Sequence, residues 1–359
     1  MKKALHLFSN INYACGISRL LKVIFSSQNS DFEHYGLFIG GEALEDFIQN
    51  FNGRIFKYKN ESFLLQTYEC ASLAKNLQID IIHAHTRRYD LIARIVKGFV
   101  SEVKTITSAH YFSNDRKLLS YKADRFIAVS EKIKKNLIKN YNISDQLIDV
   151  IYNPVDKSLY NPRINLLEER EKLKISSDFI IASYIGRFVY DVKFLDIITK
   201  NMQNIISKNN RVYFLFAGEG KDKQMLQKEI KPFDKNAKII NPGKNVESLY
   251  QISDIIIVPS PIETFGLTAI EAGLYSKAVL AHENGAPGEY LINNQNAVLF
   301  NENNYVEKFL ALAENKSLRE RIGANLKKYV DLNFNENIFF EKLKNSYDRL
   351  IEKNSLIKR

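Results

Sequence analysis

Short apolar segments alternate with longer amphipathic segments along the whole of this 359-residue chain. The apolar segments are rich in β-branched side chains and bounded by Gly, Pro, Asn or Asp, as is typical of buried parallel strands. The segments between them have the length and periodicity of helices. Such an alternation predicts an α/β fold in which parallel sheets carry helices on both faces.

The alternation falls into two sets, separated by a break at Asn153-Pro154 that is typical of an interdomain linker. In the first set we expect strands at Ala4–Phe8, Tyr35–Ile39, Asp80–His83, Val103–Ser108 and Arg125–Val129, with helices such as Ser62–Asn76 and Ser130–Asn140 between them. In the second set we expect strands at Phe179–Ile185, Arg211–Ala217, Lys238–Ile240, Ile255–Val258, Ala278–Ala281 and Ala297–Leu299, followed by a helical tail from Asn304 to Lys358. The sequence therefore predicts two doubly wound Rossmann-like domains, residues 1–155 and 156–336, facing a central cleft that binds the ligand at the carboxyl ends of the strands.

The composition excludes several other classes of protein. Apolar residues make up 45% and charged residues 26% of the chain, as in an ordinary soluble globular protein. No segment approaches the ~18 consecutive apolar residues of a membrane span, and the start MKKALHLFSN suits a first strand better than a signal peptide. The two cysteines, Cys15 and Cys70, form neither a disulfide framework nor a metal-binding spacing. We therefore expect a cytoplasmic protein.

The segment PSPIETFGLTAIEAG, residues 259–273, is the strongest candidate for a binding site. It follows a buried-strand pattern, so Gly266, Leu267 and Thr268 are expected to open a helix whose free N–H groups bind an anion. Glu263 and Glu271 lie eight residues apart, about 12 Å along the axis if the stretch is mostly helical. That separation suits the two ends of a nucleotide-sugar, with the diphosphate on the amides between them. The alternative is an ordinary acidic helix start.

A second segment, GRFVYDVKFLD at residues 186–196, follows the first expected strand of the second domain. Arg187 can bind phosphate oxygens with two hydrogen bonds, and Lys193 supplies a point charge. A diphosphate leaving group needs such cations because its charge grows as the bond to the sugar breaks. Solvated surface residues remain the alternative for this segment.

In the first domain, Gly16 precedes a helix and is a second candidate for an anion-facing helix start. His83, His85 and His110 each lie at the end of an expected strand, and His110 is the better candidate for an active site. No Cys, Asp or Glu joins the His83/His85 pair at metal-ligand spacing, and no Asp-x-Asp pair is present. We therefore expect neither a metal nor another cofactor.

The net charge of +10 is concentrated between Asp80 and Asn140, which includes Arg87, Arg88, Arg116, Lys117 and the helix-like EKIKKNLIKN. A basic surface of this kind attracts nucleic acid or anionic lipid headgroups. No nucleic-acid-binding motif accompanies it, so we expect peripheral contact with the anionic inner membrane and no nucleic acid. A solvated basic face is the alternative.

Together these motifs resemble those of the family-4 glycosyltransferases, retaining enzymes with the GT-B fold. The resemblance runs over nearly the whole chain through the Gly16 loop, HAH at 83–85, AH at 109–110, ADRFIAVSEKIKKNL, NPVD, GRF...K, AGEGK, ETFGLTAIEAG and GAPGE at 285–289. It departs from the family at two positions, since Cys15 stands where a second glycine is common and Phe194 where a glycine commonly follows the lysine.

The resemblance implies a role for each candidate residue. Glu263 would hold the hydroxyls of the donor sugar, Glu271 those of the ribose, and Arg187 and Lys193 would neutralise the diphosphate with the amides of residues 266–268. Gly16 would bring its loop against donor and acceptor, and His110 would line the acceptor side and touch the donor sugar. Such enzymes generally need no metal. Their final helix, here about residues 337–359, usually packs back on the N-terminal domain.

The resulting hypothesis is a metal-independent hexosyltransferase that moves a sugar from a nucleoside-diphosphate-sugar to a hydroxyl of a glycan or glycolipid, with retention of configuration. The expected setting is the synthesis of a bacterial surface polysaccharide or lipopolysaccharide on the inner face of the cytoplasmic membrane. Two alternatives stay open: a non-catalytic nucleotide-sugar-binding protein, and a sugar-nucleotide epimerase of the same fold.

Overall fold

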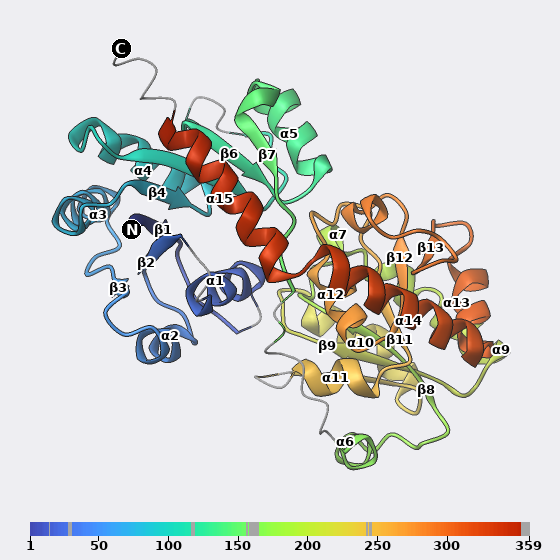
Figure 1. Cartoon of the computed structure of the whole chain (residues 1–359). Helices are drawn as coiled ribbons and strands as arrows, with labels where there is room; N and C mark the ends of the chain where they lie inside the picture. Colours follow the sequence, from blue (N-terminus) through green and yellow to red (C-terminus); the bar gives the residue numbers. More distant parts are fainter. Residues whose placement is uncertain are drawn as a thin grey trace. The chain divides into compact units, whose positions relative to one another are not determined.

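The computed structural model describes residues 1–13, 15–27, 31–115, 119–155, 157, 165–241, 243 and 246–352. The chain forms two compact units (Figure 1). The first contains Met1–Pro154 and Glu336–Arg359, and the second contains Val155–Asn335. Asp156 of the expected linker, Arg116 and Lys117 of the basic region, and residues 353–359 of the expected last helix lie outside the described residues.

The first unit is built on a seven-stranded parallel sheet of order β3-β2-β1-β4-β5-β6-β7. Its strands are β1 (Lys2–Leu7), β2 (Phe32–Phe38), β3 (Ile55–Lys57), β4 (Ile81–Ala84), β5 (Lys104–Ala109), β6 (Arg125–Ala128) and β7 (Ile148–Val150). Its helices are α1 (Gly16–Ser26), α2 (Leu44–Asn50), α3 (Phe63–Leu77), α4 (Arg87–Phe99), α5 (Glu131–Tyr141) and α15 (Glu336–Glu352), with a short 3-10 helix at Asp145–Leu147.

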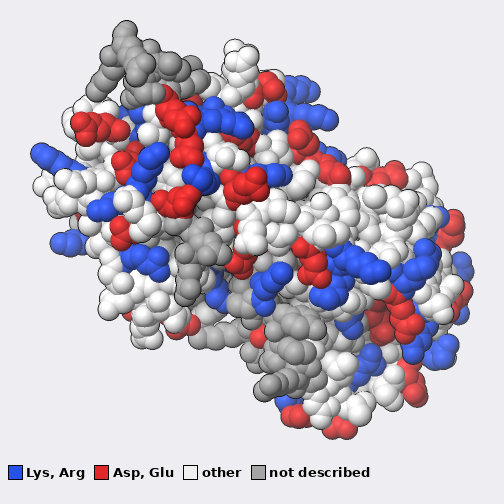
Figure 2. Space-filling model, viewed as in Figure 1, with Lys and Arg blue, Asp and Glu red and all other residues white. Residues whose placement is uncertain are grey.

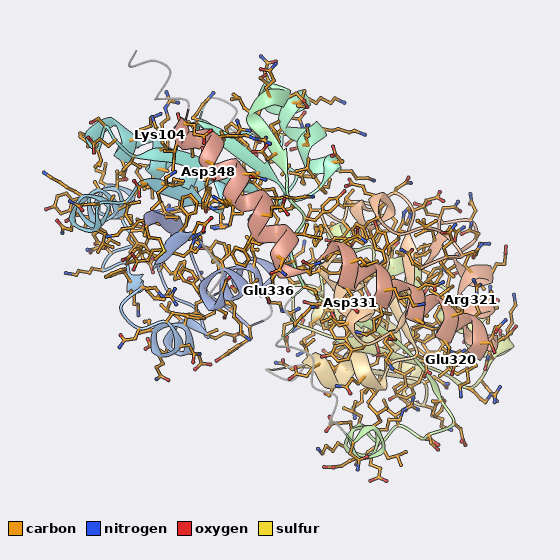
Figure 3. All side chains as sticks on the ribbon, viewed as in Figure 1. Lys104, Glu320, Arg321, Asp331, Glu336 and Asp348 are labelled. Carbon is orange, nitrogen blue, oxygen red and sulfur yellow. The ribbon has the colours of Figure 1, made fainter. Side chains whose placement is uncertain are left out.

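Two apolar layers cover the two faces of this sheet. On one face, α1, α2 and α15 pack against alternate strand residues that include Ala4, Ile81, Ile106 and Ile127. On the other face, α3 and α4 pack against Leu5, Leu7, Ile82 and Ala84. Because α15 supplies part of the first layer, the end of the described chain completes the core of the unit that the beginning of the chain started. Figure 3 labels Glu336 and Asp348 on this helix.

The second unit is built on a six-stranded parallel sheet of order β10-β9-β8-β11-β12-β13. Its strands are β8 (Ile180–Ile185), β9 (Val212–Ala217), β10 (Ala237–Ile240), β11 (Ile255–Val258), β12 (Ala278–His282) and β13 (Val298–Phe300). Its helices are α6 (Leu166–Leu173), α7 (Tyr190–Lys193), α8 (Asp196–Thr199), α9 (Met202–Lys208), α10 (Lys223–Ile230), α11 (Val246–Ile252), α12 (Leu267–Leu274), α13 (Tyr305–Glu314) and α14 (Lys316–Asn333), with 3-10 helices at Lys231–Phe233 and Ala286–Glu289.

The expected α/β class with two parallel sheets is confirmed, and every expected strand overlaps an observed one. Two short edge strands were missed. Strand β3 spans three residues, and β7 lies shortly before the expected break at Asn153-Pro154. Pairing with β6, a tertiary interaction, holds residues 148–150 extended.

Each sheet has one position where neighbouring strands lead outward in opposite directions. In the first unit these strands are β1 and β4, and in the second they are β8 and β11. At such a switch point the loops after the two strands diverge and leave room for a ligand at the carboxyl edge of the sheet. Gly16 follows β1, Arg187 and Lys193 follow β8, and Glu263 follows β11, whereas His110 follows β5, the neighbour of β4.

None of the helices in the described part of the chain combines the length and apolar character needed to cross a bilayer.

Candidate functional site

The loop after β8 begins at Gly186 and is fixed by close backbone contacts with the loop after β9. A Cβ atom on Gly218 would lie 1.9 Å from the carbonyl oxygen of Gly186, and one on Gly220 would lie 2.2 Å from that of Phe188. The amide of Phe188 also donates to the carbonyl of Glu219. The Gly-x-Gly of the sequence AGEGK therefore serves close packing between two loops, and it holds the segment that carries Arg187 and Lys193.

Lys193 and Glu263 meet at the switch point of the second sheet. Lys193 ends α7 after β8, and Glu263 lies in the turn after β11, yet the ammonium nitrogen Nζ is 2.5 Å from the carboxylate oxygen Oε2. The two side chains are 20% and 14% exposed. The pair is thus partly desolvated but still open to a ligand, and its net charge is zero.

Helix α12 begins directly after this turn with Gly266 as its N-cap. Gly266 has φ 88° and ψ 53°, and a Cβ atom there would lie 2.4 Å from Cγ of Pro287. Among the described residues no side chain caps the helix start, so these side chains leave the first N–H groups of α12 available, as anion binding requires. The Thr268 hydroxyl donates to the carbonyl of Ile185 at 3.3 Å, which ties the helix start to the end of β8.

The helix opens where it was expected, since α12 begins at Leu267 with Gly266 as its N-cap. The distance of about 12 Å assumed a mostly helical stretch from residue 263, and that condition is not met. Glu263 therefore sits in the preceding turn, where Lys193 holds it, while Glu271 lies inside the helix. Their separation is set by the left-handed conformation of Gly266 as well as by helical rise.

Glu271 is buried, with an exposed fraction of 3%, and accepts a hydrogen bond from the hydroxyl of Tyr250 on α11 at 2.5 Å. Such a hydrogen bond offsets part of the cost of burying a carboxylate and fixes the direction of its oxygens. No sequence motif pointed to Tyr250, which lies within helix α11.

Arg187 has an exposed side chain, and none of the described residues is recorded as a hydrogen-bond or ion-pair partner of its guanidinium. Its charge and that of Glu263 both act on the buried Tyr184. Burial and then Glu263 raise the pKa of the Tyr184 hydroxyl well above its ordinary value, while Arg187 acts in the opposite direction. Arg187 and Glu263 are therefore near the same hydroxyl, and Lys193 is bonded to Glu263. The second unit thus gathers Arg187, Lys193, Glu263 and the start of α12 at one edge.

In the first unit, His110 follows β5 and lines a pocket of about 580 Å³. The pocket also has apolar walls from Phe63, Leu91 and Tyr121, and the basic residues Arg87 and Arg88 at its side. His110 is buried, and burial lowers its pKa to about 3, so the ring is neutral near pH 7. Its side chain can therefore offer one hydrogen-bond donor and one acceptor.

Gly16 is the first residue of α1, whereas the sequence placed it just before a helix. Cys15 is the N-cap, with φ −98° and ψ 124°, an ordinary extended conformation that needs no glycine. Phe194 differs, because it takes the left-handed conformation with φ 56° at the end of α7. This conformation explains why glycine would be favoured after Lys193, since a side chain there costs about 1–2 kcal/mol.

Both units match known families of glycosyltransferases. Residues 167–329 match the family model described as glycosyl transferases group 1, and residues 33–159 match the model of Glycosyltransferase Family 4. An uncharacterized glycosyltransferase of Methanocaldococcus jannaschii is 28% identical over 299 residues, which cover 76% of this chain and 77% of that protein. The capsular polysaccharide biosynthesis glycosyltransferase CapM of Staphylococcus aureus is 24% identical over 246 residues, covering 66% of this chain and just under two thirds, 64%, of CapM.

Solved structures agree with this match at the level of the fold. A glycosyltransferase from Rickettsia africae superposes with a TM-score of 0.80 at 19% identity, over 98% of this chain and 99% of that one. The HepE protein of Anabaena, solved in complex with UDP, superposes with a TM-score of 0.82 at 17% identity, over 98% of this chain and 100% of that one.

Proposed function

The chain belongs to the family-4 glycosyltransferases of the GT-B fold, and from that premise we propose that it transfers a sugar from a nucleoside-diphosphate-sugar to a hydroxyl group. The observation that carries the proposal is the Lys193–Glu263 pair beside the uncapped start of α12. This arrangement offers a cation from the end of α7, and a carboxylate and the amides at the start of α12 from the segment after β11. The cation and amides suit a diphosphate, and the carboxylate suits sugar hydroxyls.

Two carboxylates close to a diphosphate would repel it, and the ion pair of Lys193 with Glu263 reduces that repulsion. Lys193 balances the charge of Glu263, and the Glu271 carboxylate is buried inside α12 with the Tyr250 hydroxyl as a hydrogen-bond donor. An ammonium group has three donors, so Lys193 can hold Glu263 and a phosphate oxygen at once. Arg187, whose exposed guanidinium can bind a phosphate with two hydrogen bonds, would supply the second cation.

In the reaction, negative charge grows on the diphosphate as its bond to the sugar breaks. Arg187, Lys193 and the first amides of α12 would stabilise that charge, because preorganised donors act most strongly where charge develops. Glu263 would hold the sugar hydroxyls and Glu271 the ribose. We propose retention of configuration by front-face displacement, in which the leaving phosphate takes the proton of the acceptor hydroxyl. No metal is part of this proposal, since the two cations fill the role of one.

The acceptor is proposed to be a glycan or glycolipid that the first unit binds. The pocket at His110 combines apolar walls with Arg87 and Arg88, as suits a ligand with both apolar and anionic parts. Large exposed apolar side chains line it, namely Tyr111, Phe112 and Leu119, and Leu64 and Tyr68 are also exposed on α3, whose first residue Phe63 lines the pocket. Such side chains, beside basic ones, favour contact with an anionic membrane surface.

The membrane-facing surface is proposed to be the one that carries these apolar side chains. On the face of the molecule seen in Figure 2, acidic and basic side chains are interspersed over α15, and several are paired, as in Lys2–Asp348 and Lys344–Asp348. Paired charges of both signs attract an anionic surface only weakly. Surface-polysaccharide synthesis is the proposed setting, in line with the name of the relative CapM.

Donor binding is tested first by thermal shift with UDP-, GDP- and ADP-sugars, each with and without EDTA. A ligand at 100 times its Kd adds about 2.7 kcal/mol to the free energy of unfolding. We expect one donor class to stabilise the wild type regardless of EDTA and to have little effect on Glu271→Ala. Tyr250→Phe is the matched control, because it keeps the carboxylate and loses only its hydroxyl partner, so it should retain part of the shift.

Catalysis is then tested by release of nucleoside diphosphate with and without an acceptor pool. Acceptor-dependent release that is lost in Glu263→Ala supports the transferase. Donor binding without release from any pool would favour the non-catalytic binding protein, and alteration of the donor sugar without an acceptor would favour the epimerase.

A further inference from the structure

Five of the six histidines of the chain gather in the first sheet. His6 on β1 is in register with His83 on β4, and His34 lies on the neighbouring strand β2. His85 and His110 follow β4 and β5. All five side chains are buried.

Four of these rings are joined end to end by hydrogen bonds between their nitrogens. Nδ1 of His34 lies 2.9 Å from Nε2 of His6, and Nδ1 of His6 lies 3.0 Å from Nε2 of His85. Nδ1 of His85 lies 3.3 Å from Nε2 of His110. We refer to His34, His6, His85 and His110 as the histidine row. His83 stands beside the row and bonds instead to the hydroxyls of Tyr347 and Ser108, each at 2.7 Å.

The rings of the row are neutral. Burial, and then the charge of Arg54, lower the pKa of His34 to about 3, and burial lowers that of His110 to about 3. Burial and the neighbouring imidazoles lower the pKa of His6 and His85 well below 6.5. A neutral imidazole carries one N–H and one lone pair, so each ring donates through one nitrogen and accepts through the other.

A count of protons then leaves only two arrangements. Every link of the row joins Nδ1 of one ring to Nε2 of the next and needs one proton. If one ring carries its proton on Nδ1, each neighbouring ring must also carry its proton on Nδ1. The same requirement then applies to the next ring, until it includes all four. Any change of tautomer within the row would leave a link with two protons or with none, and a buried polar group without a hydrogen-bond partner is unfavourable.

We propose that His34, His6 and His85 are positioning residues that fix the tautomer of His110, so that all four rings are either Nδ1–H or Nε2–H together. The ring nitrogen of His110 outside the row is Nδ1, and none of the described residues is recorded as its hydrogen-bond partner. The row therefore decides whether Nδ1 of His110 offers a donor or an acceptor. The consequence for a sugar hydroxyl at His110 rests on the proposed function, whereas the shared tautomer does not.

The direct test is an ¹⁵N spectrum of the histidine side chains in protein labelled only at histidine, because the ¹⁵N shifts distinguish the two neutral tautomers. Six histidines give a tractable spectrum, and His282 in the second unit serves as an internal reference. We expect the row to show four rings of one tautomer at pH 7. Mixed tautomers, or a doubly protonated ring, would overturn the proposal.

A metal ion would give a different result. Ligand atoms of His6, His83 and His85 lie within 4.8 Å of one another, which is close enough to consider zinc. If EDTA added to the purified protein, or Zn²⁺ added after EDTA, moves the signals of these rings, the cluster is a metal site and the row as proposed here is wrong.

Variants separate positioning from packing. His34→Phe removes the far end of the row, and we expect the signal of His110, three links away, to move together with those of His6 and His85. Tyr347→Phe is the matched control, since it removes a hydroxyl bonded only to His83 among the rings and should leave the row unchanged.

Kinetics provide the second readout, once a donor and an acceptor have been identified. His34→Phe should lower kcat about tenfold with a change in donor KM below about twofold, and His34→Asn, which restores a hydrogen-bonding group near the position of Nδ1, should recover most of the rate. An unchanged kcat in a folded His34→Phe protein would refute the positioning role. Should His34→Phe fail to fold, the wild-type spectrum alone still decides whether the tautomer is shared.

Discussion

Mild acid should destabilise the first unit, because its histidines are buried in the neutral form. In the unfolded chain a histidine has a pKa near 6.5, whereas burial lowers the pKa of His34 and His110 to about 3. Between these two values the unfolded state binds more protons than the folded state, so stability falls as the pH falls. The stability contribution of these groups is complete above pH 6.5 and is lost progressively below it.

The size of the effect follows from the unfolded pKa alone, provided that the folded pKa stays well below the pH of the experiment. Going from pH 7.5 to pH 5.5 costs about 1.4 kcal/mol for each such histidine. His34 and His110 together give about 3 kcal/mol, and His6, His83 and His85, whose pKa values are also lowered by burial, add in the same direction. Asp90 opposes them, because burial raises its pKa. In the pH dependence of stability, the five imidazole groups together outweigh this single carboxyl group.

The assay is hydrogen exchange followed by mass spectrometry at the two pH values, corrected for the intrinsic pH dependence of exchange and combined with urea unfolding. The second unit contains one histidine, His282, and is the internal control. We expect peptides of the first unit to lose at least about 3 kcal/mol of protection and those of the second unit to lose much less. Equal losses in both units, or none in the first, would refute the reasoning.

Three further predictions concern packing, charge and metal. In urea unfolding, Gly266→Ala should destabilise the second unit by at least about 1 kcal/mol more than Gly53→Ala destabilises the first. Both glycines have positive φ, but only at Gly266 does the new Cβ meet an atom within 4 Å. Asp149→Ala should lower the free energy of unfolding in urea by about 3–5 kcal/mol, since it leaves Arg125, whose side chain is 6% exposed, without its carboxylate. Lys172→Ala, at an exposed ion pair, should change the free energy of unfolding by less than about 0.5 kcal/mol. Treatment with EDTA should leave the rate of nucleoside diphosphate release unchanged, and a loss that Mg²⁺ or Mn²⁺ restores would contradict the metal-free site.

The strands were predictable where several apolar residues follow one another. The run of β-branched residues at Ile255–Val258, which Pro259 ends, gave the bounds of β11 from the sequence alone. Strand β3 has three residues at the edge of the sheet, too few for a periodic pattern. Strand β7 was hidden because Asn153-Pro154 marks a break shortly after it, and only its pairing with β6 identifies it as a strand.

The candidate site was predictable in its members and not in its contacts. The rule that ligands bind at the carboxyl ends of strands selected the loops of Lys193 and Glu263, but their ion pair joins residues 70 positions apart. Tyr250 could not be found, because a tyrosine in a helix carries no signal for the carboxylate it meets. The histidine row was missed for a similar reason, since His6 and His34 become neighbours only through the register of β1 and β2.

The first unit is made of two separate stretches of the chain, and this constrains how the protein folds during synthesis. The second unit is one continuous stretch, Val155–Asn335, so all of its core is available once that stretch has left the ribosome. The first unit needs Phe339, Leu343 and Tyr347 of α15 to cover one face of its sheet. Although proteins usually fold from the N-terminal domain onward, here the domain that is made first must be the last to finish. Until α15 has been synthesised, that face of the sheet, including the rings of the histidine row, is exposed and is a surface that chaperones can bind.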